Sequence, residues 1–137
     1  MNKETKVYIS YLIEKSINLY NVSDYLFKGE QWNSSVNRLY YSAFNMVRAL
    51  LTCIDISFKT HKGIKNMFYI HFISTNKIER KYGELYSILF NARQEADYID
   101  YTEYDFEFVS PYLEQAREFI DVISRYIKEN YLNQIDF

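Results

Sequence analysis

The stretch Asn37-Arg38-Leu39-Tyr40-Tyr41-Ser42-Ala43-Phe44 decides the fold class of this 137-residue chain. It lies in the middle of a region, residues 31–54, whose apolar side chains recur at steps of three and four. That spacing predicts a long helix with one buried face. The apolar stripe of this helix holds Trp32, Val36, Leu39, Ala43, Val47, Leu50 and Ile54.

Polar side chains form a separate stripe on the same predicted helix, again at steps of three and four. A helix that only fills a core does not need polar side chains in such a regular arrangement. The stripe consists of Arg38, Tyr41, Asn45, Arg48 and Thr52.

A matching polar pair is expected on a later helix, at residues 78–98. Arg93 and Asp97 lie one turn apart there, so their side chains can pair. We expect Arg38 and Arg93 to converge on one recess between the two helices. Guanidinium groups in excess over carboxylate suit two-point contact with phosphate. The alternative is a polar network that fixes helix register, with Asp97 neutralising Arg93.

Most of the remaining chain also has a helical pattern, at residues 3–28, 61–73 and from Ser110-Pro111 to about residue 127. Gly29 is expected to end the first helix in a left-handed conformation, and residues 99–108 are expected to form a loop. The chain has 3 Gly and 1 Pro, whereas sheets with tight turns consume both. We therefore predict one domain spanning residues 1–137, an all-α, up-and-down bundle of four long helices plus one short helix.

The amino-acid composition limits which ligands and sites the protein can have. The net charge of -2 is too small for general attraction to nucleic acid. Basic residues cluster between 59 and 81 and acidic residues between 95 and 107, which predicts either one phosphate-contacting region or two solvated faces. A single Cys excludes an internal disulfide, and two distant histidines predict no metal site.

Other signatures are missing from the sequence. No glycine-rich segment resembles a phosphate loop, and no cofactor is expected. No apolar run is long enough to span a bilayer, and residues 1–16 do not have the pattern of a signal peptide. We therefore expect a cytoplasmic protein.

His61 opens the third predicted helix, in the segment Lys59-Thr60-His61-Lys62-Gly63. It is expected either to cap that helix or to make a tertiary hydrogen bond. The alternative is contact with an anion, shared with Lys62 and the helix end.

Taken in order, residues 37–44, residues 59–63 and the segment Ala92-Arg93-Gln94-Glu95-Ala96-Asp97-Tyr98 resemble the HEPN domain. The resemblance extends from about Leu12 to about Ile127 and implies the same helical bundle. HEPN ribonucleases carry an Arg followed, after four to six residues, by a His. Counting from Arg93, the three permitted positions hold Tyr98, Ile99 and Asp100, so no catalytic residue is assigned.

The chain is instead similar to a HEPN group with Tyr-Tyr, His-Lys-Gly and Arg-x-x-Ala-Asp-Tyr elements. This resemblance implies a homodimeric member of a toxin–antitoxin or defence-type pair. Such a protein would bind nucleotide or RNA without cleavage, together with a minimal nucleotidyltransferase. The ligand-binding side chains that we predict are Arg38, Tyr40, Tyr41, Arg48, His61, Lys62, Arg93, Asp97 and Tyr98.

Two other functions stay open at this stage. One is a ribonuclease toxin with a divergent active site, which would use Arg93 with Tyr98 or His61. An imidazole that titrates near neutrality is suited to moving the ribose 2′-hydroxyl proton, whereas a tyrosine with an ordinary pKa near 10 is not. The other is an interaction module whose aromatic face docks a partner without any ligand.

Overall fold

The computed structural model describes residues 1–98 and 102–132, with the side chains of residues 96–98 outside the description. The regular secondary structure of these residues is helical, without a strand, which confirms the all-α prediction. The helices are α1 (Lys3–Lys28), α2 (Trp32–Cys53), α3 (His61–Phe68), α4 (Arg80–Tyr98) and α5 (Phe106–Ile127). Short π-helical segments continue α3 at Tyr69–Ile73 and α5 at Lys128–Leu132.

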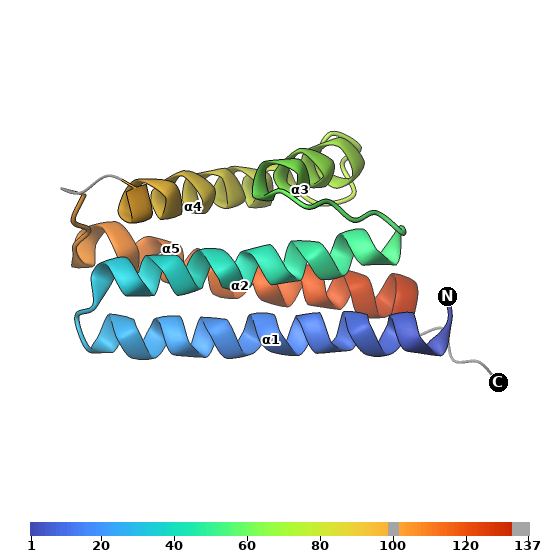
Figure 1. The fold of residues 1–137 in the computed structure, drawn as a ribbon, viewed down its shortest axis with the longest axis horizontal. Helices are drawn as coiled ribbons and strands as arrows, with labels where there is room; N and C mark the ends of the chain where they lie inside the picture. The colour runs from blue at the N-terminus through green and yellow to red at the C-terminus, as the bar shows by residue number, and fades with distance from the viewer. Residues whose placement is uncertain (99–101, 133–137) are drawn as a thin grey trace.

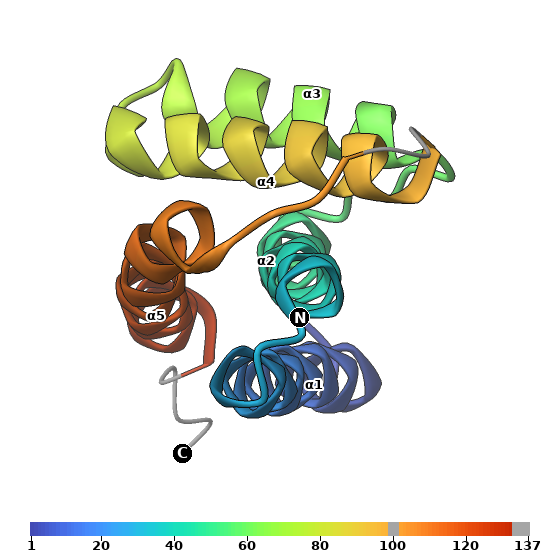
Figure 2. The same cartoon turned by 90° about the vertical axis from the view of Figure 1, so that its left-hand side faces the viewer.

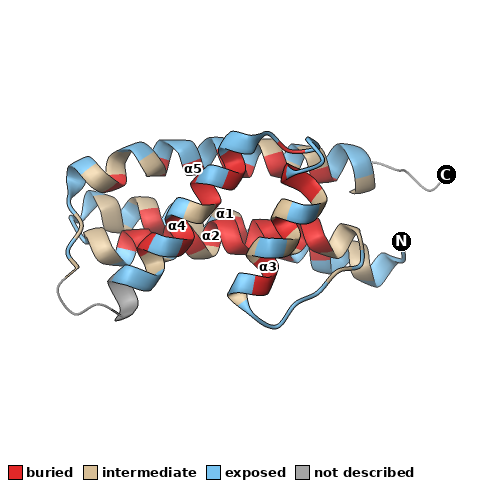
Figure 3. Ribbon diagram, turned by 90° about the horizontal axis from the view of Figure 1, so that it is seen from above, coloured by how far each residue is buried: buried red, intermediate tan, exposed pale blue. Residues whose placement is uncertain are grey.

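The helices form a bundle in which α2 is central. Figure 1 shows α1, α2 and α5 as long rods, with α3 and α4 forming a further layer over α2. The end view in Figure 2 shows the same order, with α1 and the α3–α4 layer on opposite sides of α2. Helix α2 contacts all four other helices, so most of its surface is buried, as Figure 3 shows.

Two pairs of buried serines join α1 to α2. The Ser16 hydroxyl donates to the Ser42 carbonyl at 2.6 Å, and the Ser42 hydroxyl donates to the Ser16 carbonyl at 2.7 Å. Ser23 and Ser35 repeat this exchange at 2.7 and 2.9 Å. Each small side chain lets the helices approach closely while its hydroxyl keeps a partner. The two exchanges fix the register of α1 against α2.

Helix α5 begins earlier than the sequence predicted. Asp105 is the N-cap, and its Oδ1 accepts a hydrogen bond from the backbone N–H of Phe108 at 2.9 Å. Pro111 therefore lies inside the helix instead of at its first position, so the Ser110-Pro111 prediction was wrong. The turn before the proline is stabilised by ring stacking of Phe108 on Tyr104, with centroids 4.2 Å apart.

The end of α1 also differs from the prediction. Gly29 has a φ of -87°, whereas Glu30 has a φ of 61° and takes the left-handed position. The N–H of Glu30 donates to the Phe27 carbonyl and that of Gln31 to the Leu26 carbonyl, which closes the helix. A left-handed conformation costs a residue with a side chain about 1–2 kcal/mol, a cost that glycine avoids.

We therefore expect Glu30→Gly to raise the free energy of unfolding by about 0.5–1 kcal/mol. This gain is smaller than the strain that the glycine removes, because glycine also gives the unfolded chain more conformational freedom. Urea denaturation of the two proteins measures the change. Gly29→Ala is the matched control, because a Cβ at Gly29 meets only ordinary contacts and φ is already negative. If Glu30→Gly had a lower free energy of unfolding than the wild-type protein, Glu30 would not be strained in its left-handed conformation.

Candidate functional site

A hydrogen bond between α2 and α3 lies at the centre of the candidate site. The Tyr40 hydroxyl lies 2.8 Å from Nδ1 of His61. The Tyr40 side chain is fully buried, and this burial raises the pKa of its hydroxyl to about 12. The hydroxyl is therefore protonated at neutral pH and can donate to Nδ1, and in that arrangement Nε2 is the ring nitrogen that carries a hydrogen.

The His-Lys-Gly element brings the imidazole to this place by building the first turn of α3. The Thr60 side chain is the cap, since its hydroxyl accepts from the Gly63 N–H at 2.9 Å. A Cβ on Gly63 would overlap the Phe58 ring and the Thr60 hydroxyl, so a larger residue here would force both side chains to shift. Of the expected roles of His61, capping was wrong and the tertiary hydrogen bond is confirmed.

Three aromatic rings surround the imidazole. His61 stacks on Phe44, with ring centroids 4.3 Å apart and planes 8° from parallel. The Tyr41 ring stands at right angles to it, at 5.7 Å, and the Tyr40 ring stacks at the same centroid distance, with planes 21° from parallel. The Tyr-Tyr element and Phe44 thus form one aromatic wall around His61.

Two guanidinium groups complete the site. The Arg93 guanidinium lies over two rings, 5.7 Å from the centroid of Tyr40 and 5.5 Å from that of Tyr41. Its Nη2 donates to the Tyr41 hydroxyl at 3.1 Å. Each such cation–π contact contributes about 0.5–1 kcal/mol, more where water is excluded. Helix α4 is thereby attached to α2 at the predicted polar stripe of α2, which includes Tyr41.

Arg48 approaches from the other side of the polar stripe of α2. Its guanidinium lies 5.6 Å from the Phe44 centroid. Its Nη1 donates to Asn45 Oδ1 at 3.2 Å, and its Nη2 donates to the Tyr8 hydroxyl, on α1, at 2.8 Å. Both acceptors are uncharged, so within the described part of the chain these contacts leave the positive charge of Arg48 uncompensated.

The pKa of His61 is lowered from its ordinary value of 6.5, first by partial burial and then by the positive charges of Arg93 and Arg48. The neutral imidazole is therefore the form that prevails at pH 7. The unfolded chain therefore binds the His61 proton more tightly than the folded chain does. The neutral imidazole contributes its full stability above about pH 6.5, and this stability is lost as the pH falls below that value.

The predicted polar stripe of α2 lines a shallow hollow of about 240 Å³. Its lining includes Arg38, Tyr41, Asn45 and Arg48. Arg38 is exposed and donates to the side-chain oxygen of Asn37. Arg93 does not line this hollow, so the hollow does not place Arg38 and Arg93 in one recess as expected. Tyr41, which lines it beside Arg38, accepts a hydrogen bond from Arg93.

The other predicted site residues are less closely connected. Lys62 is exposed in the first turn of α3. The side chains of Asp97 and Tyr98 lie outside the described residues, and so does the expected pair of Arg93 with Asp97. No group of three or more potential metal ligands occurs among the residues that the structure describes. Within the same residues, no helix has the length and hydropathy needed to cross a membrane.

Sequence reasoning missed two members of the site. Phe44 stood inside a quoted segment but was not assigned a role, although it carries the closest ring contact of His61. Tyr8 followed the spacing of an ordinary core residue of the first helix, yet its side chain is 42 % exposed and accepts from Arg48. The pairing of helices, which no periodicity encodes, determines both contacts.

Comparison with known proteins matches this chain to one family. The family model of the HEPN domain matches residues 9–127. The chain belongs to the HEPN domain family. Its Tyr-Tyr, His-Lys-Gly and Arg-x-x-Ala-Asp-Tyr elements supply Tyr40, Tyr41, His61 and Arg93 to the cluster of rings and cations described above.

Three relatives cover most of this HEPN protein. A UPF0332 protein of Thermotoga maritima is 32% identical over 94% of this chain and 97% of its own length. Two proteins of Methanocaldococcus jannaschii bear the names "Putative toxin MJ0142" and "Putative toxin MJ0605". The first is 34% identical over 85% of this chain and 79% of its own length. The second is 30% identical over 94% of this chain and 96% of its own length.

The electrostatics of the site can be measured through His61. We expect its pKa, followed by NMR of the imidazole carbon-bound protons, to lie below 6.5 in the wild-type protein. Arg93→Gln and Arg48→Gln should each raise it, because each removes a nearby positive charge. Arg80→Gln, which changes an exposed arginine paired with Glu84, is the matched control and should leave it unchanged. A wild-type value of 6.5 or above would show that the imidazole is not held as described.

Proposed function

We propose that this HEPN protein is a toxin-type member of its family that binds the phosphate of a nucleotide or of RNA at the cluster of Tyr40, Tyr41, His61 and Arg93. The observation that carries the proposal is the gathering of two guanidinium groups and one imidazole around the same three rings. A cluster of this kind offers donors for phosphate, and the partly exposed ring of Tyr41 adds a flat surface for a base.

The donor set fits an anionic ligand. Arg48 makes its side-chain hydrogen bonds to uncharged oxygens, so a phosphate does not have to displace a carboxylate from it. With Tyr40 donating to Nδ1, the Nε2–H of His61 adds a neutral donor. Guanidinium groups bind phosphate in two-point contacts that a single ammonium group cannot make.

The proposal includes partners. Two relatives carry the word toxin in their names, and a toxin needs a protein that restrains it. We propose that the chain forms a homodimer and works with a minimal nucleotidyltransferase, as the family resemblance implies. Light scattering on the purified protein should then give about twice the 16.6 kDa of one chain.

A ribonuclease with a divergent active site is the second candidate. The observation that favours it is the position of His61, whose neutral imidazole lies against the ring of Tyr41, the tyrosine that Arg93 binds. In this candidate the imidazole carries its hydrogen on Nδ1 and donates it to the Tyr40 hydroxyl, which leaves Nε2 free to accept the ribose 2′-hydroxyl proton. Cleavage of RNA by the wild-type protein, lost in His61→Gln, would establish this candidate over binding without cleavage.

Ligand binding is tested by thermal unfolding in the presence of AMP. We expect AMP to raise the melting temperature of the wild-type protein, because a ligand at 100 times its Kd stabilises the folded state by about 2.7 kcal/mol. Arg93→Gln and His61→Gln should each abolish this rise. Arg93→Gln should cost about 1–2 kcal/mol of stability through its two lost ring contacts, which leaves the chain folded.

Arg80→Gln is the control variant and should keep the full response to AMP, because Arg80 is exposed. An equal response in Arg93→Gln would refute the proposed site. Unfolding of Arg93→Gln at room temperature would instead support the polar network that fixes helix register. No response in any variant, combined with tight capture of a second protein, would favour the interaction module.

A further inference from the structure

Three adjoining hollows run along the surface of α2. The first, of about 240 Å³, is lined by Lys15, Arg38 and Arg48 among others. The second, of about 100 Å³, shares Arg48 with the first and is also lined by Tyr8. The third, of about 320 Å³, shares Tyr8 with the second. Each hollow shares lining residues with the next, so the three lie in a row, called here the α1–α2 groove.

The groove has a basic end. Lys15, Arg38 and Arg48 line the first hollow, and no Asp or Glu lines it. Arg38 and Arg48 donate to uncharged oxygens of Asn37, Asn45 and Tyr8. Among the described residues, three positive charges therefore face this hollow without a carboxylate beside them.

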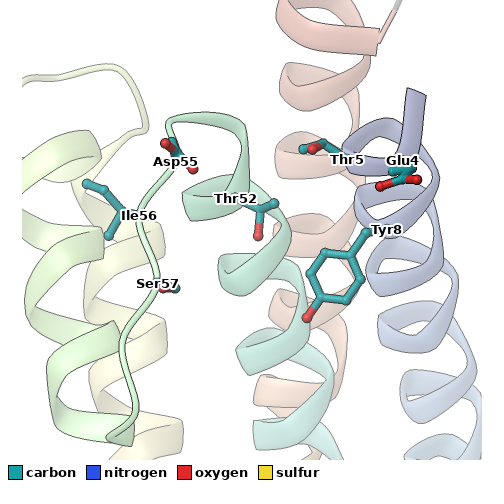
Figure 4. A pocket seen from close by; sticks show the side chains of 7 residues that line it. All are labelled: Glu4, Thr5, Tyr8, Thr52, Asp55, Ile56 and Ser57. Atoms are coloured by element: carbon teal, nitrogen blue, oxygen red, sulfur yellow. The ribbon is translucent and has the colours of Figure 1, made fainter. Parts of the chain in front are cut away.

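The opposite end of the groove is acidic. Figure 4 shows the third hollow, where Tyr8 extends from α1 toward Thr52 on α2. Glu4 and Asp55 line this hollow together with hydroxyl groups. Two carboxylates repel phosphate, so they mark the limit of any bound phosphate chain.

Exposed rings lie beside the basic end. Tyr8 is 42 % and Tyr11 is 54 % exposed, and the two rings stack with centroids 6.4 Å apart. The Lys15 ammonium lies 5.9 Å from the Tyr11 centroid, so the rings and the cations belong to the same surface. Aromatic rings next to cations are the features with which proteins hold single-stranded nucleic acid, since every base has a face that can stack.

The length of the groove exceeds the needs of a mononucleotide. Arg38 and Arg48 line the first hollow, and Arg48 also lines the second, together with Tyr8. Ten residues of α2 separate the two arginines, which at a helical rise of 1.5 Å per residue is about 15 Å. A ligand that follows the whole basic and aromatic part of this surface is therefore a chain of several nucleotides.

We propose that the α1–α2 groove binds single-stranded nucleic acid, with phosphates on Lys15, Arg38 and Arg48 and bases stacked on Tyr8 and Tyr11. This inference rests on the proposed function, because it names the ligand as an oligonucleotide that continues from the Arg93 and His61 cluster. Arg48 and Tyr41 connect the two, since both line the first hollow and both contact groups of that cluster.

The test is fluorescence anisotropy with a fluorescein-labelled oligouridylate of ten nucleotides. The double variant Lys15→Gln/Arg38→Gln should bind at least tenfold more weakly than the wild-type protein. The slope of log K against log salt should fall by about 1.4, because each cation lost from contact with a single strand changes it by about 0.7. Tyr11→Ala should weaken binding about tenfold through one lost stacking contact.

The matched control is Lys77→Gln/Arg80→Gln, which removes the same two residue types from exposed positions elsewhere. It should bind the oligouridylate like the wild-type protein. An equal loss in this control would overturn the proposed location, because it would mean that net charge alone determines the affinity. Equal affinity for a ten-base-pair duplex would overturn the single-strand requirement.

The response to AMP separates this inference from the proposed function. Tyr11→Ala should keep the rise in melting temperature with AMP, since Tyr11 lies outside the cluster of Tyr40, Tyr41, His61 and Arg93. If AMP binds and the double variant holds the oligouridylate as tightly as the wild-type protein, the groove is refuted and the cluster stands. If the wild-type protein binds neither probe, both proposals fail.

Discussion

Helix α2 is largely buried, and this constraint determines the rest of the structure. It contacts every other helix of the bundle, and thirteen of its residues are buried. A polar group that is buried without a partner costs about 1–3 kcal/mol. The polar side chains of α2 must therefore find partners on neighbouring helices, and those partners define how the helices are placed.

The partners form a consistent pattern. Ser35 and Ser42 exchange hydrogen bonds with serines of α1, and Tyr40 bonds to His61 of α3. Tyr41 accepts from Arg93 of α4. The same bonds that satisfy α2 thus collect an imidazole and two guanidinium groups at one place. In this HEPN protein, the architecture of the core and the chemistry of the candidate site have a common origin.

The fold could be predicted from the sequence because its signals are local. Periodicity and the scarcity of Gly and Pro indicated the helices, and residues 61–73 match the observed α3 and its π-helical continuation. The errors occurred where a local signal competed with another contact. Ser110-Pro111 resembled a helix start, but the Asp105 cap and the packing of Phe108 started the helix earlier.

The candidate site was predictable only in part. The stripe of Arg38, Tyr41, Asn45 and Arg48 follows from spacing on one helix, and the structure places all four around one hollow. The roles of Phe44 and Tyr8 depend on where α3 and α1 meet α2, which spacing cannot reveal. The cations of the groove come from α1 and α2 rather than from the basic stretch at 59–81, because packing and not sequence proximity gathers them.

The attachment of His61 has a consequence for heat inactivation. The imidazole is carried by the first turn of α3, a helix of 8 residues that follows an extended connection. Helices this short are marginal without tertiary packing, and their ends open before the core does. Fraying of one turn at Thr60 would withdraw the imidazole while α1, α2 and α5 stay assembled. Loss of ligand recognition would then precede global melting, and cooling would restore it without refolding of the bundle.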